Sequence, residues 1–183
     1  GIAGNLFHAY LVLENVQREK VASFGKPFLE SVLSRIGYEP GANEKHTSSI
    51  LRDQIISHAV LYGSEDVEDM ALRKFTSLMR NENIHPDIVK SIMQVGALNG
   101  DDKAFDWFET RFNTSESEHD RMNILVALGC FREKKLIQRA QQYILGRVPG
   151  RNKFVPIASM TANPNAVPHM WDWFRSQLNA LEQ

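Results

Sequence analysis

The sequence contains a single cysteine, Cys130, so the chain forms neither an internal disulfide nor a cysteine-rich zinc site. None of its six histidines lies four residues from another, and no H-E-x-x-H motif occurs. The glycine loops that hold nucleotides and the G-x-S-x-G turn of hydrolases are missing as well. We therefore assign no catalytic residue and no metal ligand to this chain.

The sequence also lacks an excess of charge of either sign. Its 21 Lys and Arg residues balance 22 Asp and Glu residues, whereas nucleic-acid-binding domains are usually strongly basic. The longest apolar run, residues 124–128, is far shorter than the roughly 18 residues that span a bilayer. We predict no nucleic-acid partner and no membrane contact by this chain.

What is present is typical of an ordered globular protein. Apolar residues make up 43% and charged residues 23% of the 183 residues, a length that suits one good-sized domain. We treat residues 1–183 as a single domain. The low cysteine content favours a cytoplasmic location, although Asn113-Thr114-Ser115 matches the glycosylation signal of secreted proteins.

Apolar residues recur at three- and four-residue steps along most of the chain, which predicts amphipathic helices. No segment alternates apolar and polar residues for long enough to predict a strand. Gly25-Lys26-Pro27 interrupts the second helix, whose start we place at Lys20 or at Pro27. The predicted helices cover residues 5–17, 20–36, 47–62, 64–79, 86–98, 101–112, 117–129, 136–144, 154–162 and 170–181.

These helices form pairs that are joined by short turns at Gly63, Gly100, Cys130 and Pro164. The turns are 37, 30 and 34 residues apart, a near-constant spacing that is typical of helical repeats. Each pair buries its apolar face only against its neighbours. The predicted fold is therefore all-α, a HEAT- or armadillo-like superhelix of stacked antiparallel helix pairs.

Several polar residues could take part in catalysis or ligand binding, but for each of them a structural role is the favoured interpretation. The acidic pairs Glu65/Asp66 and Asp101/Asp102 directly follow turns, where carboxylates stabilise a helix N-terminus. His58 lies on an apolar helix face, which predicts a hydrogen-bonded core histidine.

Tryptophan and cysteine give similar predictions. Trp107, Trp171 and Trp173 are interpreted as core residues and not as a ligand-binding aromatic box, but Trp171 and Trp173 cannot both face inward on one helix. One of them should be partly exposed. Cys130 is expected to be a small buried hydrophobic residue.

A basic segment extends from Arg132 to Lys153. For most of it we predict a solvated helix face. Arg147 and Arg151 differ, because glycine and proline hold them in a loop between two helix pairs. A guanidinium in a loop can present its forked donors to a carboxylate, so Arg151 and Arg147 are the candidate substrate-binding residues.

Several of these segments together resemble the C-terminal helical domain of zinc aminopeptidases related to aminopeptidase N, including the puromycin-sensitive and endoplasmic-reticulum aminopeptidases. The resemblance runs from about Ser48 to the end of the chain. It rests on Leu51-Arg52, residues 59–63, residues 125–130, the helix that contains Leu136, the loop 150–153, Asn163-Pro164 and Trp171-Asp172-Trp173-Phe174.

The resemblance implies a helical bowl that covers a thermolysin-like catalytic domain, restricts access to peptides and holds the far end of the substrate. It implies no cofactor in this chain and zinc in the parent catalytic domain, because the zinc motif and the G-x-M-E-N segment belong to that preceding domain. The implied partners are that domain and the peptide. Arg151, with Arg147 beside it, corresponds to the family's loop arginine, and we expect the chain to be the C-terminal fragment of a longer protein.

The alternative is a free-standing HEAT-type scaffold whose groove binds a partner protein or helix. A stand-alone enzyme is a weaker hypothesis, because no nucleophile and base can be paired. An H-E-x-x-H motif several hundred residues upstream would favour the aminopeptidase, and further helical repeats would favour the scaffold.

Overall fold

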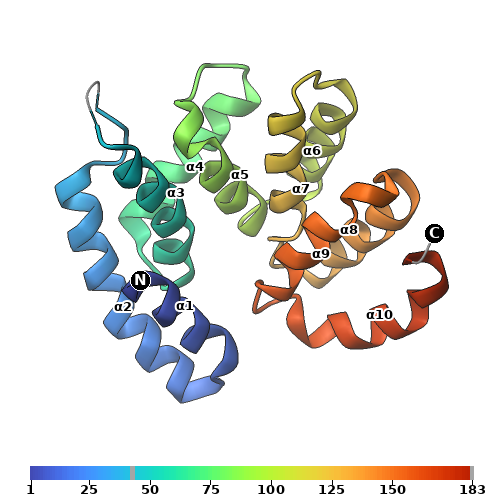
Figure 1. The fold of residues 1–183 in the computed structure, drawn as a ribbon, viewed down its shortest axis with the longest axis horizontal. Coiled ribbons are helices and arrows are strands. Elements are labelled where there is room, and N and C mark those ends of the chain that lie inside the picture. Colours follow the sequence, from blue (N-terminus) through green and yellow to red (C-terminus); the bar gives the residue numbers. More distant parts are fainter. Residues whose placement is uncertain (42–43, 182–183) are drawn as a thin grey trace. The chain divides into compact units, whose positions relative to one another are not determined.

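The computed structural model describes residues 1–41 and 44–181 (Figure 1). Within these residues there are ten α-helices, one short 3-10 helix and no strand, so the predicted all-α fold is confirmed. The same part of the chain includes no helix with both the length and the apolar character needed to cross a membrane. The helices are α1 (Ile2–Val12), α2 (Asn15–Ile36), α3 (His46–Leu61), α4 (Glu65–Met79), α5 (Pro86–Leu98), α6 (Asp102–Thr114), α7 (Glu118–Leu128), α8 (Lys134–Arg147), η1 (Gly150–Asn152), α9 (Phe154–Thr161) and α10 (Val167–Leu181).

The helices divide into two compact units, Gly1–Val95 and Gly96–Gln183, and the boundary falls within α5. In the first unit α2 packs against α1 and α3, and α3 packs against α4. In the second unit α7 packs against α6 and α9, and α9 packs against α10. Most of these contacts join helices that are neighbours in sequence, and the contact between α7 and α9 joins helices of successive predicted pairs, as expected of helical repeats.

Helix α2 differs from its prediction, because it begins at Asn15 and continues through Pro27 without a break. Proline inside a helix costs about 3 kcal/mol. That cost is offset by packing: Leu29 and Leu33 are fully buried, and each buried leucine contributes roughly 1.5–3 kcal/mol. At Gly25 the ring of Tyr62 lies only 2.6 Å from where a Cβ would be, so glycine allows the close contact.

The core of the second unit is aromatic. Phe105, Phe108 and Phe112 form the inner face of α6, as the sequence predicts. The ring of Phe131, from the turn before α8, lies 5.3 Å from that of Phe105, and the ring of Tyr143 lies 6.1 Å from it. Stacked and edge-to-face arrangements of this kind stabilise a core beyond the area that they bury.

The turns that follow α7 and α9 are joined by side chains. Asn163 is buried, and its Nδ2 donates to the carbonyl oxygens of Gly129, at 3.0 Å, and Phe131, at 2.8 Å. The Ser159 hydroxyl donates to the carbonyl oxygen of Val126 at 2.6 Å. The carbonyl groups of Gly129 and Phe131 lie just beyond α7, where no N–H of the helix pairs with them, so Asn163 satisfies acceptors that would otherwise be buried and unpaired.

Two further side-chain predictions can be compared with the structure. Trp171 is 67% exposed and Trp173 is half-buried, so the prediction that one of them is partly exposed is confirmed, whereas the prediction of a core residue is wrong for Trp171. Cys130 is half-buried, not fully buried as predicted. Its Sγ lies 3.4 Å from the carbonyl oxygen of Val126 and 3.4 Å from the hydroxyl of Ser159.

The close approach of α7 and α9 gives a testable prediction. A Cβ at Gly129 would lie 2.5 Å from the Cβ of Ser159 and 2.8 Å from the backbone nitrogen of Met160. Gly129→Ala should therefore lower the free energy of unfolding by about 1–3 kcal/mol, as measured by urea denaturation.

Gly146→Ala is the matched control. Gly146 lies in α8, and a Cβ there meets nothing within 4 Å. Since alanine favours a helix over glycine by up to about 1 kcal/mol, this variant should be unchanged or more stable. Equal destabilisation by both substitutions would contradict the proposed close contact.

Candidate functional site

The two candidate substrate-binding arginines lie on either side of a short connection in the second unit. Arg147 is the last residue of α8, and Arg151 is the central residue of η1. Both side chains are exposed, and neither forms a hydrogen bond or ion pair with another residue in the described part of the chain. Their guanidinium groups are therefore available to a ligand, and their role remains a prediction.

Two other residues of the basic segment form ion pairs: Lys135 is exposed, as the predicted solvated face requires, whereas Arg139 is half-buried. Lys135 Nζ lies 2.7 Å from Asp102 Oδ2, and Arg139 Nη2 lies 2.6 Å from Asp106 Oδ1 and 3.4 Å from Glu109 Oε2. The hydrogen bond from Lys135 holds the pKa of Asp102 below its usual value. The acidic residues of α6 face α8, and this arrangement could not be seen from the basic segment alone.

The acidic residues at helix starts behave as predicted. Asp101 Oδ1 accepts a hydrogen bond of 3.0 Å from the backbone N–H of Ala104, which caps α6. Glu65 and Asp66 lie in the first turn of α4, where carboxylates stabilise the helix. Asp102, in the first turn of α6, has the additional ion pair with Lys135.

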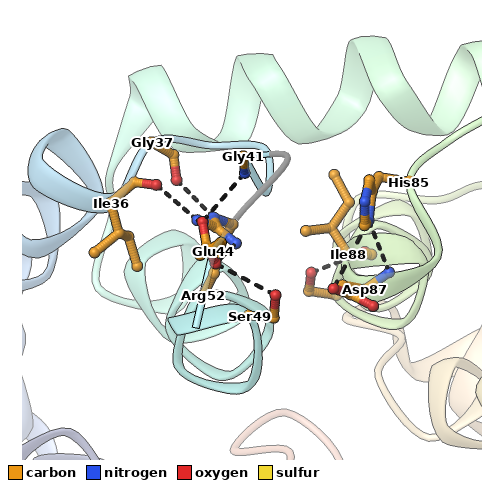
Figure 2. Close-up of polar contacts among 10 residues, drawn as sticks. Ile36, Gly37, Gly41, Glu44, Ser49, Arg52, His85, Asp87 and Ile88 are labelled. Atoms are coloured by element: carbon orange, nitrogen blue, oxygen red, sulfur yellow. Dashed lines mark hydrogen bonds and ion pairs between the residues drawn. The ribbon is translucent and has the colours of Figure 1, made fainter. Parts of the chain in front are cut away.

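Arg52 is a buried charged residue whose contacts the sequence did not reveal. Its side chain is 0% exposed, and its guanidinium donates to the carbonyl oxygens of Gly37, at 2.7 Å, and Ile36, at 2.6 Å (Figure 2). Glu44, whose side chain is 16% exposed, accepts further hydrogen bonds from the same guanidinium, one of them at 2.8 Å. The hydrogen bond from Arg52 lowers the pKa of Glu44 to about 2. The group joins the end of α2 to α3.

A groove lies between α3 and α5 in the first unit. Its volume is about 520 Å³, within the range of small ligand sites. Nine of its ten lining residues are polar or charged, and the one apolar residue, Ile50, is 56% exposed. The lining residues of this α3–α5 groove are His46, Ser49, Ile50, Asp53, Gln54, Ser57, His58, Asp87, Lys90 and Gln94.

Asp53 connects the two walls of the α3–α5 groove. It is buried on α3, and its Oδ1 accepts a hydrogen bond of 3.0 Å from the backbone N–H of Ser91 on α5. Its Oδ2 lies 2.5 Å from Lys90 Nζ, also on α5. The carboxylate therefore has a partner for each oxygen, and the two contacts fix the spacing of the helices.

His58 lies on the same groove and is buried, as the sequence predicts. Burial lowers its pKa to about 4, so the ring is neutral near pH 7. The predicted hydrogen bond is absent at one nitrogen, because Nδ1 has no partner among the described residues. The ring is held instead by stacking on Phe7, with the ring centres 3.9 Å apart and the planes at 13°.

The described residues offer no metal site. They include no group of three or more His, Cys, Asp or Glu side chains that is placed to hold a metal ion. The described side chains therefore do not fit a zinc ion.

The family model described as the ERAP1-like C-terminal domain matches residues 1–183. The chain belongs to the ERAP1-like C-terminal domain family. The resemblance to the C-terminal domain of aminopeptidases is thereby confirmed, and the HEAT-like superhelix known for the ERAP1-like C-terminal domain agrees with the stacked helix pairs of each unit.

Curated relatives of this family member are longer aminopeptidases. The mitochondrial aminopeptidase 2 of Saccharomyces cerevisiae is 22% identical over 171 residues, which cover 90% of this chain and 18% of the relative. Aminopeptidase 2 of Candida albicans is 21% identical over 93% of this chain and 19% of its own length. The alanine/arginine aminopeptidase of S. cerevisiae is 23% identical over 81% of this chain and 18% of its own length. The chain thus spans about a fifth of the length of these relatives.

The Arg52–Glu44 pair predicts a pH-dependent stability. The pKa of Glu44 falls from its ordinary 4.5 to about 2 on folding, so the pair stabilises the fold fully above pH 4.5 and loses its effect as the pH falls toward 2. Glu44→Gln should lower the thermal midpoint at pH 7, and the gap to the wild type should narrow between pH 4.5 and pH 2.

Glu82→Gln serves as the control, because Glu82 is an exposed carboxylate outside this cluster. Thermal unfolding followed by circular dichroism at several pH values measures both variants. A Glu44→Gln gap that stays constant from pH 7 to pH 3 would show that the carboxylate of Glu44 does not stabilise the fold.

Proposed function

We propose that this chain is the C-terminal domain of a zinc-dependent aminopeptidase, that it closes the peptide-binding chamber over the preceding catalytic domain, and that it contacts the peptide. The observation that carries the proposal is the family match along the entire chain, together with relatives that are aminopeptidases about five times as long. Zinc and the hydrolytic chemistry are assigned to the preceding domain, because side chains that fit the metal are absent from the described residues.

In this proposal the chain binds the peptide and limits which peptides enter the chamber, and it takes no part in bond cleavage. Helix pairs that are joined by buried polar bonds form a rigid wall, and a rigid wall limits the size of peptide that reaches a chamber. Arg151, exposed on η1, would donate a forked pair of hydrogen bonds to the carboxyl end of the peptide, with Arg147 beside it.

The free-standing scaffold remains the alternative, and the upstream sequence distinguishes the two. The size of the relatives favours a domain of a longer enzyme. A cytoplasmic location remains a prediction from the cysteine content alone.

The role of Arg151 is tested in the full-length protein with a pair of peptide substrates, one with a free C-terminal carboxylate and one amidated. A charge-assisted hydrogen bond contributes about 1.5–3 kcal/mol, so Arg151→Ala should raise KM for the free peptide by roughly tenfold or more. The amidated peptide and a small aminoacyl reporter should be cleaved as before, since neither offers a carboxylate.

Arg132→Ala is the control, because it removes another exposed arginine of the second unit. If Arg151→Ala and Arg132→Ala give the same KM for the free peptide, Arg151 does not bind the carboxylate.

Zinc is tested separately. Metal analysis should find about one zinc per full-length molecule, and a chelator should abolish cleavage of the aminoacyl reporter. A full-length protein that cleaves the reporter equally well after complete removal of metal would contradict the assignment of a zinc aminopeptidase.

A further inference from the structure

We infer that one side of α10 is an interface with the domain that precedes this one in the same polypeptide. This side, the outer stripe of α10, is formed by Val167, Trp171 and Phe174, which are 45%, 67% and 40% exposed. The inference rests on the proposed function, from which it takes the preceding catalytic domain. It adds the surface by which the two domains meet.

Helix α10 presents apolar side chains on two sides. Val167, Trp171 and Phe174 follow one another at steps of four and three residues, so they share one side of the helix. Met170 and Trp173 form an inner stripe, about 100° further round the helix. A surface helix of a globular protein usually has one apolar stripe, so the wider apolar arc of α10 indicates a second partner.

The inner stripe already has its partners inside the second unit. Met170 is buried, and its sulfur lies 3.7 Å from Nε2 of Gln141 on α8. Trp173 is half-buried, and α10 packs against α9. The indole of Trp171, in contrast, makes no hydrogen bond or ring contact with any other residue that the structure describes. The outer stripe is therefore the apolar part of α10 that its own unit leaves uncovered.

The composition of the outer stripe is that of an interface. A helix pair that closes a stack of repeats needs a polar outer face, because water covers it. The outer stripe instead carries Trp171 and Phe174, and aromatic residues are enriched at the buried centres of protein interfaces. The exposed polar residues Asp172 and Ser176 lie on a third side of the helix, which is the side that suits water.

The size of the outer stripe decides which partner it fits. Aromatic side chains offer about 150–250 Å² each, so at these exposures the stripe presents roughly 300 Å². A stable complex between separate proteins buries about 800 Å² on each partner, so the stripe is too small to hold a second copy or an unattached protein by itself. A segment that is tethered to the same chain has an effective concentration near millimolar, so a small apolar contact is enough to hold it.

The tethered partner is the remainder of the parent protein. This chain corresponds to 18% of the mitochondrial aminopeptidase 2 of S. cerevisiae and 19% of the aminopeptidase 2 of C. albicans, so about four-fifths of such a protein lies outside it. The domain that the proposed function places before this one is therefore present at every copy of the outer stripe, and it is the occupant that we assign.

Photochemical crosslinking in the full-length protein tests the inference. Trp171 is replaced by p-benzoylphenylalanine, an aromatic residue that bonds to neighbouring C–H groups under ultraviolet light, and the crosslinked peptides are identified by mass spectrometry. The expected products join position 171 to residues that precede Gly1 in the same molecule, in a yield that does not depend on protein concentration. The same replacement at Ser176, exposed on the third side of α10, is the matched control and should give few or none of these products.

A second variant tests the contribution of the tryptophan itself. With the photoreactive residue at Phe174, Trp171→Ser should lower the yield of the same products by at least about threefold, because tryptophan is a frequent hot spot of interfaces. Ser176→Ala should leave that yield unchanged. Since Trp171 and Ser176 are both exposed, each variant should keep the helix content of the wild type, as measured by circular dichroism.

Crosslinks between two copies, crosslinks to residues 1–95 of this chain, equal yields at positions 171 and 176, or no crosslink from position 171 would each overturn the inference. Zinc content and cleavage of the aminoacyl reporter test the proposed function independently. A protein that contains zinc and cleaves the reporter, yet gives one of these results, loses the interface alone. A protein that gives the expected crosslinks but cleaves the reporter without metal keeps the interface and loses the assignment of a zinc aminopeptidase.

Discussion

Buried hydrogen bonds to the carbonyl groups at the end of an earlier helix are the interaction on which both units depend. In the first unit the guanidinium of Arg52, on α3, donates hydrogen bonds to the carbonyl oxygens of Ile36 and Gly37 at the end of α2. In the second unit the side-chain amide of Asn163 donates hydrogen bonds to the carbonyl oxygens of Gly129 and Phe131, which follow α7. Carbonyls at and just beyond the end of a helix have no partner within it, and burying them without partners costs about 1–3 kcal/mol each. Packed helix ends therefore need such a donor.

These bonds also explain how a stack of helices can offer a defined surface. Apolar packing alone tolerates small shifts of one helix along another, whereas a hydrogen bond to a particular carbonyl does not. Asp53 acts in the same way between α3 and α5, where its two oxygens fix the walls of the α3–α5 groove. A wall of this kind suits the proposed role in enclosing a peptide, since it positions binding groups without taking part in bond cleavage.

The sequence predicts the helices well because the apolar periodicity and the Gly and Pro turns are local signals. The predicted start of α5 at Pro86 and the cap at Asp101 were confirmed for that reason. Arg52 was missed, since a charged residue on an inward stripe with Ile55 and Ala59 reads as a surface residue until its partners, up to 16 residues away, are known. The α3–α5 groove was missed for the same reason. The predicted start of α2 at Lys20 or Pro27 was wrong, because tertiary packing overrides the local helix propensity around Pro27.

The most direct test is the free energy of unfolding of Arg52→Met, measured by urea denaturation at pH 7. Methionine fills a similar volume but leaves two carbonyls and the carboxylate of Glu44 without their donor. Each carbonyl left without its donor costs about 1–3 kcal/mol, so Arg52→Met should lose about 2 kcal/mol or more. A variant within about 0.5 kcal/mol of the wild type, the ordinary range for surface substitutions, would contradict it.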